Sequence, residues 1–225
     1  MSGLAGLAAL FRRDAASAFR QGGGGLVPLG FFVMTAALAP LALAADGASA
    51  GGETLRALAP GLVWLAAALA ALLSMERAYQ SDFEEGGLDL LVIGPAPLVM
   101  AALIKGASFW LVNCAPVAMA APVVSLLFDL PIGRGAALAA SLAFGSACFS
   151  LIGSAAAALV VGVRRGGMLI AVLALPLFTP ALIFGVAAAR DGLASAGGQL
   201  LVGYTLFCLV ACPIAAAAAL RINVE

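Results

Sequence analysis

The hydrophobic positions of this chain fall into six long runs, and most polar residues lie between them. A helix needs roughly 20 apolar residues to cross a bilayer core about 30 Å thick, and each run reaches or nearly reaches that length. Spanning segments are expected to be helical, because an open sheet edge cannot be satisfied in lipid. The runs cover residues 26–45, 58–75, 98–122, 136–162, 168–189 and 200–220. The pattern predicts an all-α, polytopic membrane protein with six transmembrane helices in one domain, residues 1–225.

Prolines in the third and fifth runs could interrupt the predicted helices. The third run is long and either continues through or breaks near Pro116 or Pro122. In the fifth run, Pro176 and Pro180 each remove a backbone donor and clash with the preceding turn. The fifth run is therefore either one kinked span or two half-helices that dip in from the far side. We favour the broken, re-entrant form.

The composition favours lipid over water as the solvent of this chain. It is 64% hydrophobic and 10% charged, with a mean hydropathy of +1.15, whereas a soluble domain is about half apolar and about a quarter charged. The net charge is zero, so nothing suggests nucleic acid. Histidine is absent from the sequence, which removes the commonest general base and metal ligand. Without a nucleophile–base pair, a phosphate loop or an H-E-x-x-H motif, we expect no catalytic residue, no metal site and no bound cofactor.

The basic residues between the runs predict the orientation, because lysine and arginine gather in cytoplasmic loops. Counted this way, one side of the membrane receives eight basic residues and the other receives three, Arg56, Arg134 and Arg190. The eight are Arg12, Arg13, Arg20, Arg77, Lys105, Arg164, Arg165 and Arg221. Both termini and the loop 76–97 are therefore expected in the cytoplasm.

The leader, residues 1–25, carries apolar residues at helical spacing, with its arginines largely elsewhere around the helix. This pattern is typical of a helix that lies in the membrane interface. One alternative is a basic flank that only sets the topology. Another is a cleaved signal peptide, but the apolar run that follows is longer than the 7–15 residues usual for such a signal.

Small residues recur every fourth position in the fourth run, at Ser146, Ser150, Ser154, Ala158 and Gly162. They would stack on one face of a helix. Such faces let helices approach closely, and this packing drives helix association in lipid. We expect a helix-packing face there, against either another helix of this chain or another subunit.

The remaining notable side chains in the runs are Lys105, Trp64, Trp110 and four cysteines. An ionisable group in a membrane is a functional candidate. Lys105 lies near the cytoplasmic end of its run, however, and we expect its ammonium group to extend to the headgroups. The tryptophans are expected to be interfacial anchors. The cysteines contain no C-x-x-C pair, and we expect them to act as small hydrophobic residues.

The loop 76–97 concentrates charge, since five of the eleven acidic residues lie between Glu76 and Asp89. The second span is expected to continue into the cytoplasm until Gly86 and Gly87, and a short amphipathic helix would follow. A solvated loop is the alternative, but it would leave several large apolar side chains in water. We favour a docking element for a cytoplasmic partner. Its predicted residues are Asp82, Phe83, Glu84, Glu85, Gly86, Leu88, Asp89 and Leu91.

Short patterns that are weak individually occur in order along the whole length. They are AFRQGG at 18–23, LVPLGFF at 26–32, APGLVWLAAALAALLSMER at 59–77, DFEEGGLDLL at 82–91, RRGGMLIAVLALPLF at 164–178, PALIFG at 180–185 and AALRI at 218–222. With these patterns in this order, the chain resembles the CcmB family, the permease subunit of the ABC-type complex of cytochrome c maturation. One departure is Gly87, where family members often carry Ser or Thr, and this weakens the helix N-cap expected there.

The resemblance implies an ABC-2 type permease in the bacterial inner membrane, with an N-terminal elbow helix and a cytoplasmic coupling helix. It implies a dimeric CcmA-like ATPase that binds ATP, CcmC-like and CcmD-like membrane subunits and, indirectly, a CcmE-like haem chaperone. The docking residues would then transmit nucleotide-driven motion. Haem is a possible cargo. Because the chain lacks histidine and loops 46–57, 129–135 and 190–199 are short, we favour release of the haem-loaded chaperone over haem passage through this subunit.

Three further interpretations remain open. The chain could be an ABC-2 type exporter of another small or lipid-like substrate. It could be a secondary transporter without an ATPase, which predicts paired intramembrane acids or an internal repeat. It could also be a scaffold that binds an ATPase and moves nothing.

Overall fold

A computed structural model describes residues 3–20, 25–45, 51–75, 97–163 and 166–224, together with Tyr79, Phe83 and Gly87. In these residues the secondary structure is helical, as predicted, and the helices are joined by turns. The elements are α1 (Gly3–Arg20), α2 (Leu26–Ala45), α3 (Gly51–Met75), α6 (Leu98–Phe109), the π-helical segment η1 (Trp110–Cys114), α7 (Ala115–Leu127), α8 (Ile132–Leu159), α9 (Gly166–Asp191) and α10 (Ala196–Val224).

Five helical segments among the described residues are long and apolar enough to cross a membrane. They are Gly52–Met75, Leu98–Leu127, Ile132–Leu159, Gly166–Asp191 and Ala196–Ile222. In α2 the corresponding apolar stretch, Leu26–Ala42, is shorter. The fold is therefore that of a multi-pass helical membrane protein, and the count of six spans stays a prediction.

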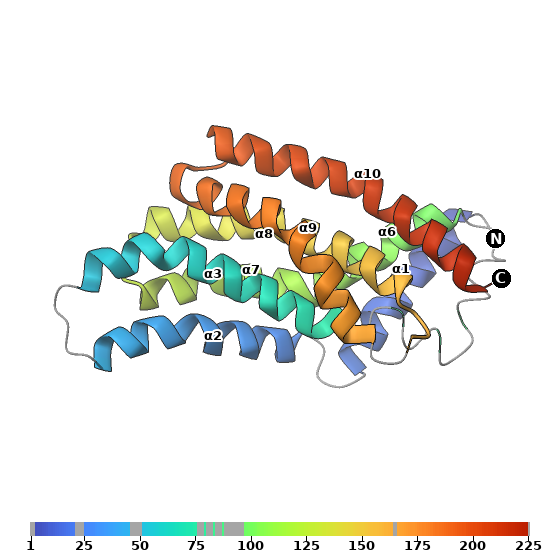
Figure 1. The fold of residues 1–225 in the computed structure, drawn as a ribbon, viewed down its shortest axis with the longest axis horizontal. Helices are drawn as coiled ribbons and strands as arrows, with labels where there is room; N and C mark the ends of the chain where they lie inside the picture. Colours follow the sequence, from blue (N-terminus) through green and yellow to red (C-terminus); the bar gives the residue numbers. More distant parts are fainter. Residues whose placement is uncertain are drawn as a thin grey trace.

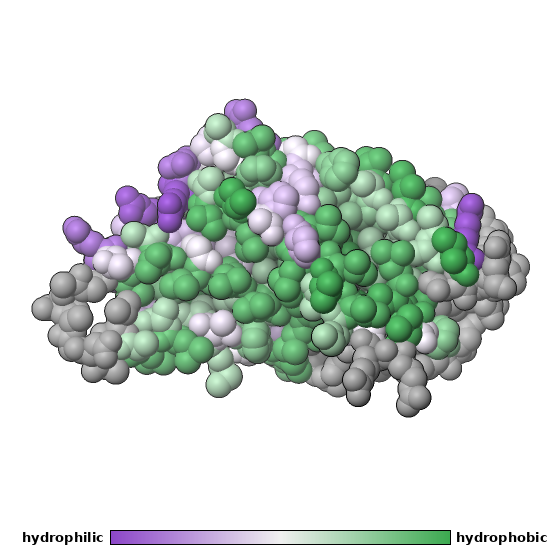
Figure 2. All heavy atoms as spheres, in the orientation of Figure 1, coloured by the Kyte–Doolittle hydropathy of each residue, from purple (hydrophilic) through white to green (hydrophobic). Residues whose placement is uncertain are grey.

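The long helices lie side by side along the longest axis, and α1 and the last turns of α10 lie at the same end of the molecule (Figure 1). Helix α8 is central, because it packs against α3, α6, α7, α9 and α10. In the apolar stretch of α8, 61% of the residues are buried, compared with 28% in that of α9. Figure 2 shows hydrophobic residues covering the middle of the molecule. The outward side chains of α9 and α10 include Met168, Val172, Ile183, Phe207 and Val210, a surface suited to lipid or to other membrane subunits.

The prediction of an interfacial anchor at Trp64 is wrong, because its side chain is completely buried in the core. Its indole ring lies against Gly145 of α8 and Gly185 of α9. A Cβ atom at either glycine would fall 2.4 or 2.2 Å from ring carbons. The indole Nε1 donates to Ser141 Oγ at 3.3 Å, and the ring packs edge-on to Phe149. Trp64 thus joins α3, α8 and α9.

The expectation of a broken or re-entrant fifth span is also wrong. Helix α9 runs without interruption from Gly166 to Asp191, with Pro176 and Pro180 inside it. Nearby hydroxyl groups supply additional donors to its carbonyls. Tyr204 Oη donates to Leu177 O at 2.6 Å, and Thr179 Oγ1 donates to Leu175 O at 3.2 Å. Proline is tolerated in membrane helices that are packed against neighbouring helices, and α9 packs against α3, α8 and α10.

The third run continues as one span rather than breaking at Pro116, because it widens into the π-helical segment η1 just before that proline. The start of α2 packs closely on this segment. A Cβ atom at Gly25 would lie 2.1 Å from Val112 O, so only glycine fits this approach. Single π-helical turns inside α-helices occur frequently at functional sites.

Candidate functional site

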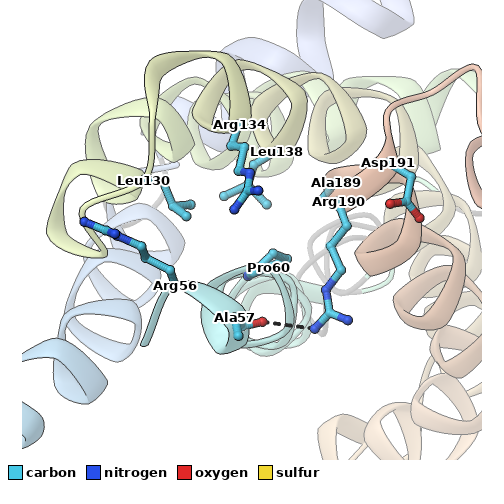
Figure 3. A pocket seen from close by; sticks show the side chains of 9 residues that line it. All are labelled: Arg56, Ala57, Pro60, Leu130, Arg134, Leu138, Ala189, Arg190 and Asp191. Carbon is cyan, nitrogen blue, oxygen red and sulfur yellow. Dashed lines mark hydrogen bonds between the residues drawn. The ribbon is translucent and has the colours of Figure 1, made fainter. Parts of the chain in front are cut away.

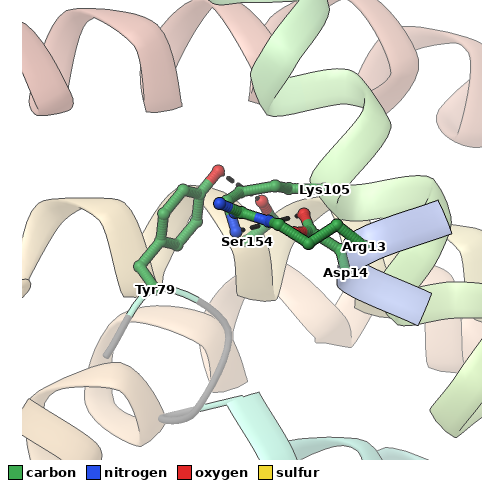
Figure 4. A network of polar contacts seen from close by, with 5 residues as sticks. All are labelled: Arg13, Asp14, Tyr79, Lys105 and Ser154. Carbon is green, nitrogen blue, oxygen red and sulfur yellow. Dashed lines mark hydrogen bonds and ion pairs between the residues drawn. The ribbon is translucent and has the colours of Figure 1, made fainter. Parts of the chain in front are cut away.

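Polar side chains meet at both ends of the helix bundle. At the end where α3 and α8 begin and α9 stops, Arg56, Arg134 and Arg190 line a pocket (Figure 3). At the other end, where α1 and the last turns of α10 lie, five residues form what we call the polar junction: Arg13, Asp14, Tyr79, Lys105 and Ser154 (Figure 4). The junction involves the segment that was predicted to dock a partner, so we take it as the candidate functional site.

An ion pair between α6 and α1 forms the centre of the polar junction. Lys105 Nζ lies 3.2 Å from Asp14 Oδ2, and Lys105 is only 7% exposed. The expectation that Lys105 reaches the lipid headgroups is therefore wrong. Helix α1 packs against α6 and η1 and brings a carboxylate to the ammonium group inside the protein. Asp14 Oδ1 also accepts from Arg13 Nε and Nη2, at 3.2 and 3.0 Å.

Tyr79 connects this ion pair to the central helix. Its side chain is buried, and its hydroxyl lies 3.1 Å from Ser154 Oγ of α8. Lys105 Nζ lies 5.0 Å from the centroid of the Tyr79 ring, within the range of a cation–π interaction. Tyr79 follows α3 by four residues. The polar junction therefore links α1, α6 and α8 to the chain just beyond α3.

The small-residue face of α8 makes its described contacts within this chain. Ser146 Oγ accepts from Trp110 Nε1 at 3.0 Å, and Ser150 Oγ donates to Gly106 O of α6. Further along the same face, Ser154 meets Tyr79, as given above. The face therefore lies against the third span and against the segment that follows α3.

Gly162 continues this face beyond the end of α8 and has a φ of +78°, a conformation that other residues adopt only with strain. A Cβ atom there would lie 2.9 Å from Phe83 Cζ. The Phe83 ring thus rests on this turn while remaining 45% exposed. Near the end of α3, Met75 packs on Gly153 of α8, where a Cβ atom would lie 2.3 Å from its sulfur. Close contacts to α8 or to the turn that follows it therefore recur at Met75, Tyr79 and Phe83.

Phe83 is the one predicted docking residue that the structure describes, and it is helical. The other predicted docking residues lie outside the described residues: Asp82, Glu84, Glu85, Gly86, Leu88, Asp89 and Leu91. The sequence analysis missed two members of the polar junction, Asp14 and Tyr79. A signal for Asp14 was available, because it is the only acidic residue in the leader.

The cysteines lie in η1, α8 and α10 and form no disulfide. Cys148 Sγ lies 3.1 Å from Thr205 Oγ1 and so contributes to the packing of α8 on α10. Their predicted role as small hydrophobic residues stays a prediction.

Comparison of the sequence with known proteins identifies its relatives. The family model described as CcmB protein matches residues 5–223. The chain is 44% identical over 221 residues to Heme exporter protein B of Paracoccus denitrificans, an alignment that covers 96% of this chain and 99% of the relative. Identity to the protein of the same name is 41% over 220 residues in Bradyrhizobium diazoefficiens and 34% over 224 residues in Escherichia coli. These alignments cover 96% of this chain and 97% and 98% of those relatives. This chain therefore belongs to the CcmB family.

Proposed function

We propose that this chain is the membrane permease subunit of an ABC-type complex in cytochrome c biogenesis. It would couple ATP hydrolysis in a CcmA-like ATPase dimer to haem trafficking. Family membership and the name Heme exporter protein B of its relatives support haem as the cargo of the complex. The observation that carries the coupling role is the contact of Tyr79 with the central helix α8 and of Phe83 with the turn that follows it.

The proposed mechanism needs no chemistry in this chain. ATP binding draws the ATPase pair together, and the segment 76–97, docked on it, moves. Tyr79 passes this movement to α8 and Phe83 to the turn after it, while the Lys105–Asp14 pair brings α1 along. The membrane arrangement shifts only if the ATP-bound ATPase binds one arrangement better than the other.

CcmC-like and CcmD-like membrane subunits would complete the complex in the bacterial inner membrane, with both termini of this chain in the cytoplasm. Within such a complex, the transmitted movement would release a haem-loaded CcmE-like chaperone from the CcmC-like subunit. The absence of histidine from the sequence supports this role over passage of haem through the chain, because imidazole is a common haem ligand.

The test separates docking from transmission. Phe83→Asp with Leu88→Asp should abolish co-purification of the ATPase while leaving the chain in the membrane. Tyr79→Phe should keep the ATPase bound but lower cytochrome c maturation several-fold, because Ser154 loses its buried partner. The matched control is Tyr204→Phe, which removes a hydroxyl group that donates to Leu177 O away from the polar junction. Unchanged ATPase recovery in the double variant would refute docking. Equal maturation in the two tyrosine variants would refute transmission through Tyr79.

A secondary transporter is the second candidate, and the buried Lys105–Asp14 pair favours it, because such pairs occur in proton-coupled carriers. The two candidates differ in their need for ATP. If an ATPase-dead partner leaves haem delivery to c-type cytochromes intact while the complex assembles, the transporter without an ATPase is the better description. Loss of delivery supports the permease.

A further inference from the structure

The pocket at the opposite end from the polar junction has a volume of about 340 Å³, within the range of about 300–1,000 Å³ typical of small-molecule sites. Its walls come from α3, with Arg56 and Pro60, from α8, with Arg134, from α9, with Arg190 and Asp191, and from the turn before α8 (Figure 3). These three arginines are the ones that the charge count assigned to the far side of the membrane. The fold thus gathers them around one cavity.

Two of the arginines are held on the walls of the pocket. Arg56 forms an ion pair with Asp129, and its Nε donates to Asp129 O at 3.0 Å. Arg190 Nη2 donates to Ala57 O at 3.0 Å. A guanidinium group carries five N–H donors, so this bond leaves most of those of Arg190 available.

Arg134 is the arginine that can receive a ligand. Figure 3 shows its guanidinium group pointing into the middle of the pocket, toward Pro60. Within the described residues, no carboxylate lies at ion-pair distance from it. Arg134 lies in the first turn of α8, whose N-cap, Pro131, offers no side-chain acceptor. The positive end of the helix dipole therefore adds to its charge. Asp191 is the one acidic residue in the lining, against three arginines.

The surroundings of the pocket suit a ligand with an apolar body. The arginines lie at or near helix ends, where membrane spans meet the headgroup region. Apolar residues complete the lining of the pocket, among them Leu130 and Leu138. An amphiphile could place its tail along these residues and its charged group between the arginines. Guanidinium groups match phosphate and carboxylate oxygens through paired hydrogen bonds.

We propose that this pocket binds the oxyanion of an amphiphile, a phosphate or carboxylate group, through Arg134 with help from Arg190. This inference goes beyond the proposed function and does not need the partner ATPase. Two sources share the chemistry: an anionic phospholipid of the far leaflet, and a porphyrin with free carboxylates.

The test uses the purified full chain in detergent and two probes. The first probe is phosphatidylglycerol, with zwitterionic phosphatidylcholine as its comparison, and bound lipid is measured by native mass spectrometry. Arg134→Gln should weaken phosphatidylglycerol binding about tenfold, the effect of losing one charge-assisted contact. Arg221→Gln is the matched control, because it removes an exposed arginine near the other end of the molecule. It should leave binding unchanged.

The second probe is zinc mesoporphyrin, followed by fluorescence and compared with its dimethyl ester, which lacks the carboxylate charges. Asp191→Asn should strengthen binding of either probe, because it removes the acidic residue of the lining. This second variant tests the site even if Arg134→Gln folds poorly. Arg134-dependent binding of phosphatidylglycerol supports the site with lipid as the source. Arg134-dependent, ester-sensitive binding of the porphyrin supports it with carboxylate as the source. If Arg134→Gln binds both probes like the wild type, or the wild type binds neither, the proposal is overturned.

Discussion

The ion pair between Lys105 and Asp14 can be tested directly, because Lys105 is the single lysine of the chain. An amine-reactive reagent therefore reports on this side chain once the N-terminal amine is distinguished by mass spectrometry of the peptides. Lys105 is buried, and so the structure predicts slow labelling in the native protein. A lysine extended to the headgroups would react quickly. The informative perturbation is Asp14→Asn, which removes the charge of the partner and keeps its size.

The expected magnitude follows from the distance and the burial. At 3.2 Å the attraction is about 5 kcal/mol for an effective dielectric constant of 20. Both side chains are largely buried, with 6% and 11% exposed, so desolvation offsets part of this attraction. Removing one partner of such a pair lowers stability by about 3 kcal/mol or more, because the other charge stays buried without its partner. If the labelling rate follows the population in which Lys105 is exposed to the reagent, the rate should rise about a hundredfold in Asp14→Asn.

Arg13→Gln provides the control on the same helix. The Arg13 side chain is 52% exposed, and exposed ion pairs contribute at most about 1 kcal/mol. Labelling of Lys105 should therefore rise less than about fivefold in this variant. Equal labelling rates in Asp14→Asn and Arg13→Gln would refute the reasoning. So would labelling of the native protein as fast as labelling of the denatured chain.

Two further predictions concern packing. Gly185→Ala should destabilise the protein by about 1–3 kcal/mol in detergent unfolding experiments, because its Cβ would fall 2.2 Å from the buried Trp64 ring. Gly61→Ala, also within a helix, meets nothing within 4 Å and should be neutral or stabilising by up to about 1 kcal/mol; a Gly61→Ala variant as unstable as Gly185→Ala would contradict this. Cys208→Ser and Cys212→Ser should each retain cytochrome c maturation, and its loss in both, at normal protein levels, would show that the thiols are needed.

The positions of the membrane helices could be predicted from the sequence to a large extent. The apolar runs at 136–162 and 200–220 correspond to α8 and α10, because the thickness of a bilayer imposes a minimum length on any apolar span. The prolines misled the prediction for 168–189. A local rule says that Pro176 and Pro180 weaken a helix, but it does not include the packing of α9 against α3, α8 and α10. In α9 the tertiary surroundings prevailed over the local preference.

The sequence by itself determined that this is a multi-pass helical chain, and its ordered patterns indicated its family, because hydrophobic run length and local motifs are properties of neighbouring residues. Only the tertiary structure decided which polar groups meet. Asp14 with Lys105, and Arg56 with Arg134 and Arg190, are far apart in the chain and come together through helix packing. The same holds for Trp64, whose burial depends on two glycines from other helices. Such pairings depend on the relative rotation and depth of packed helices, which hydrophobic periodicity along a single helix does not encode.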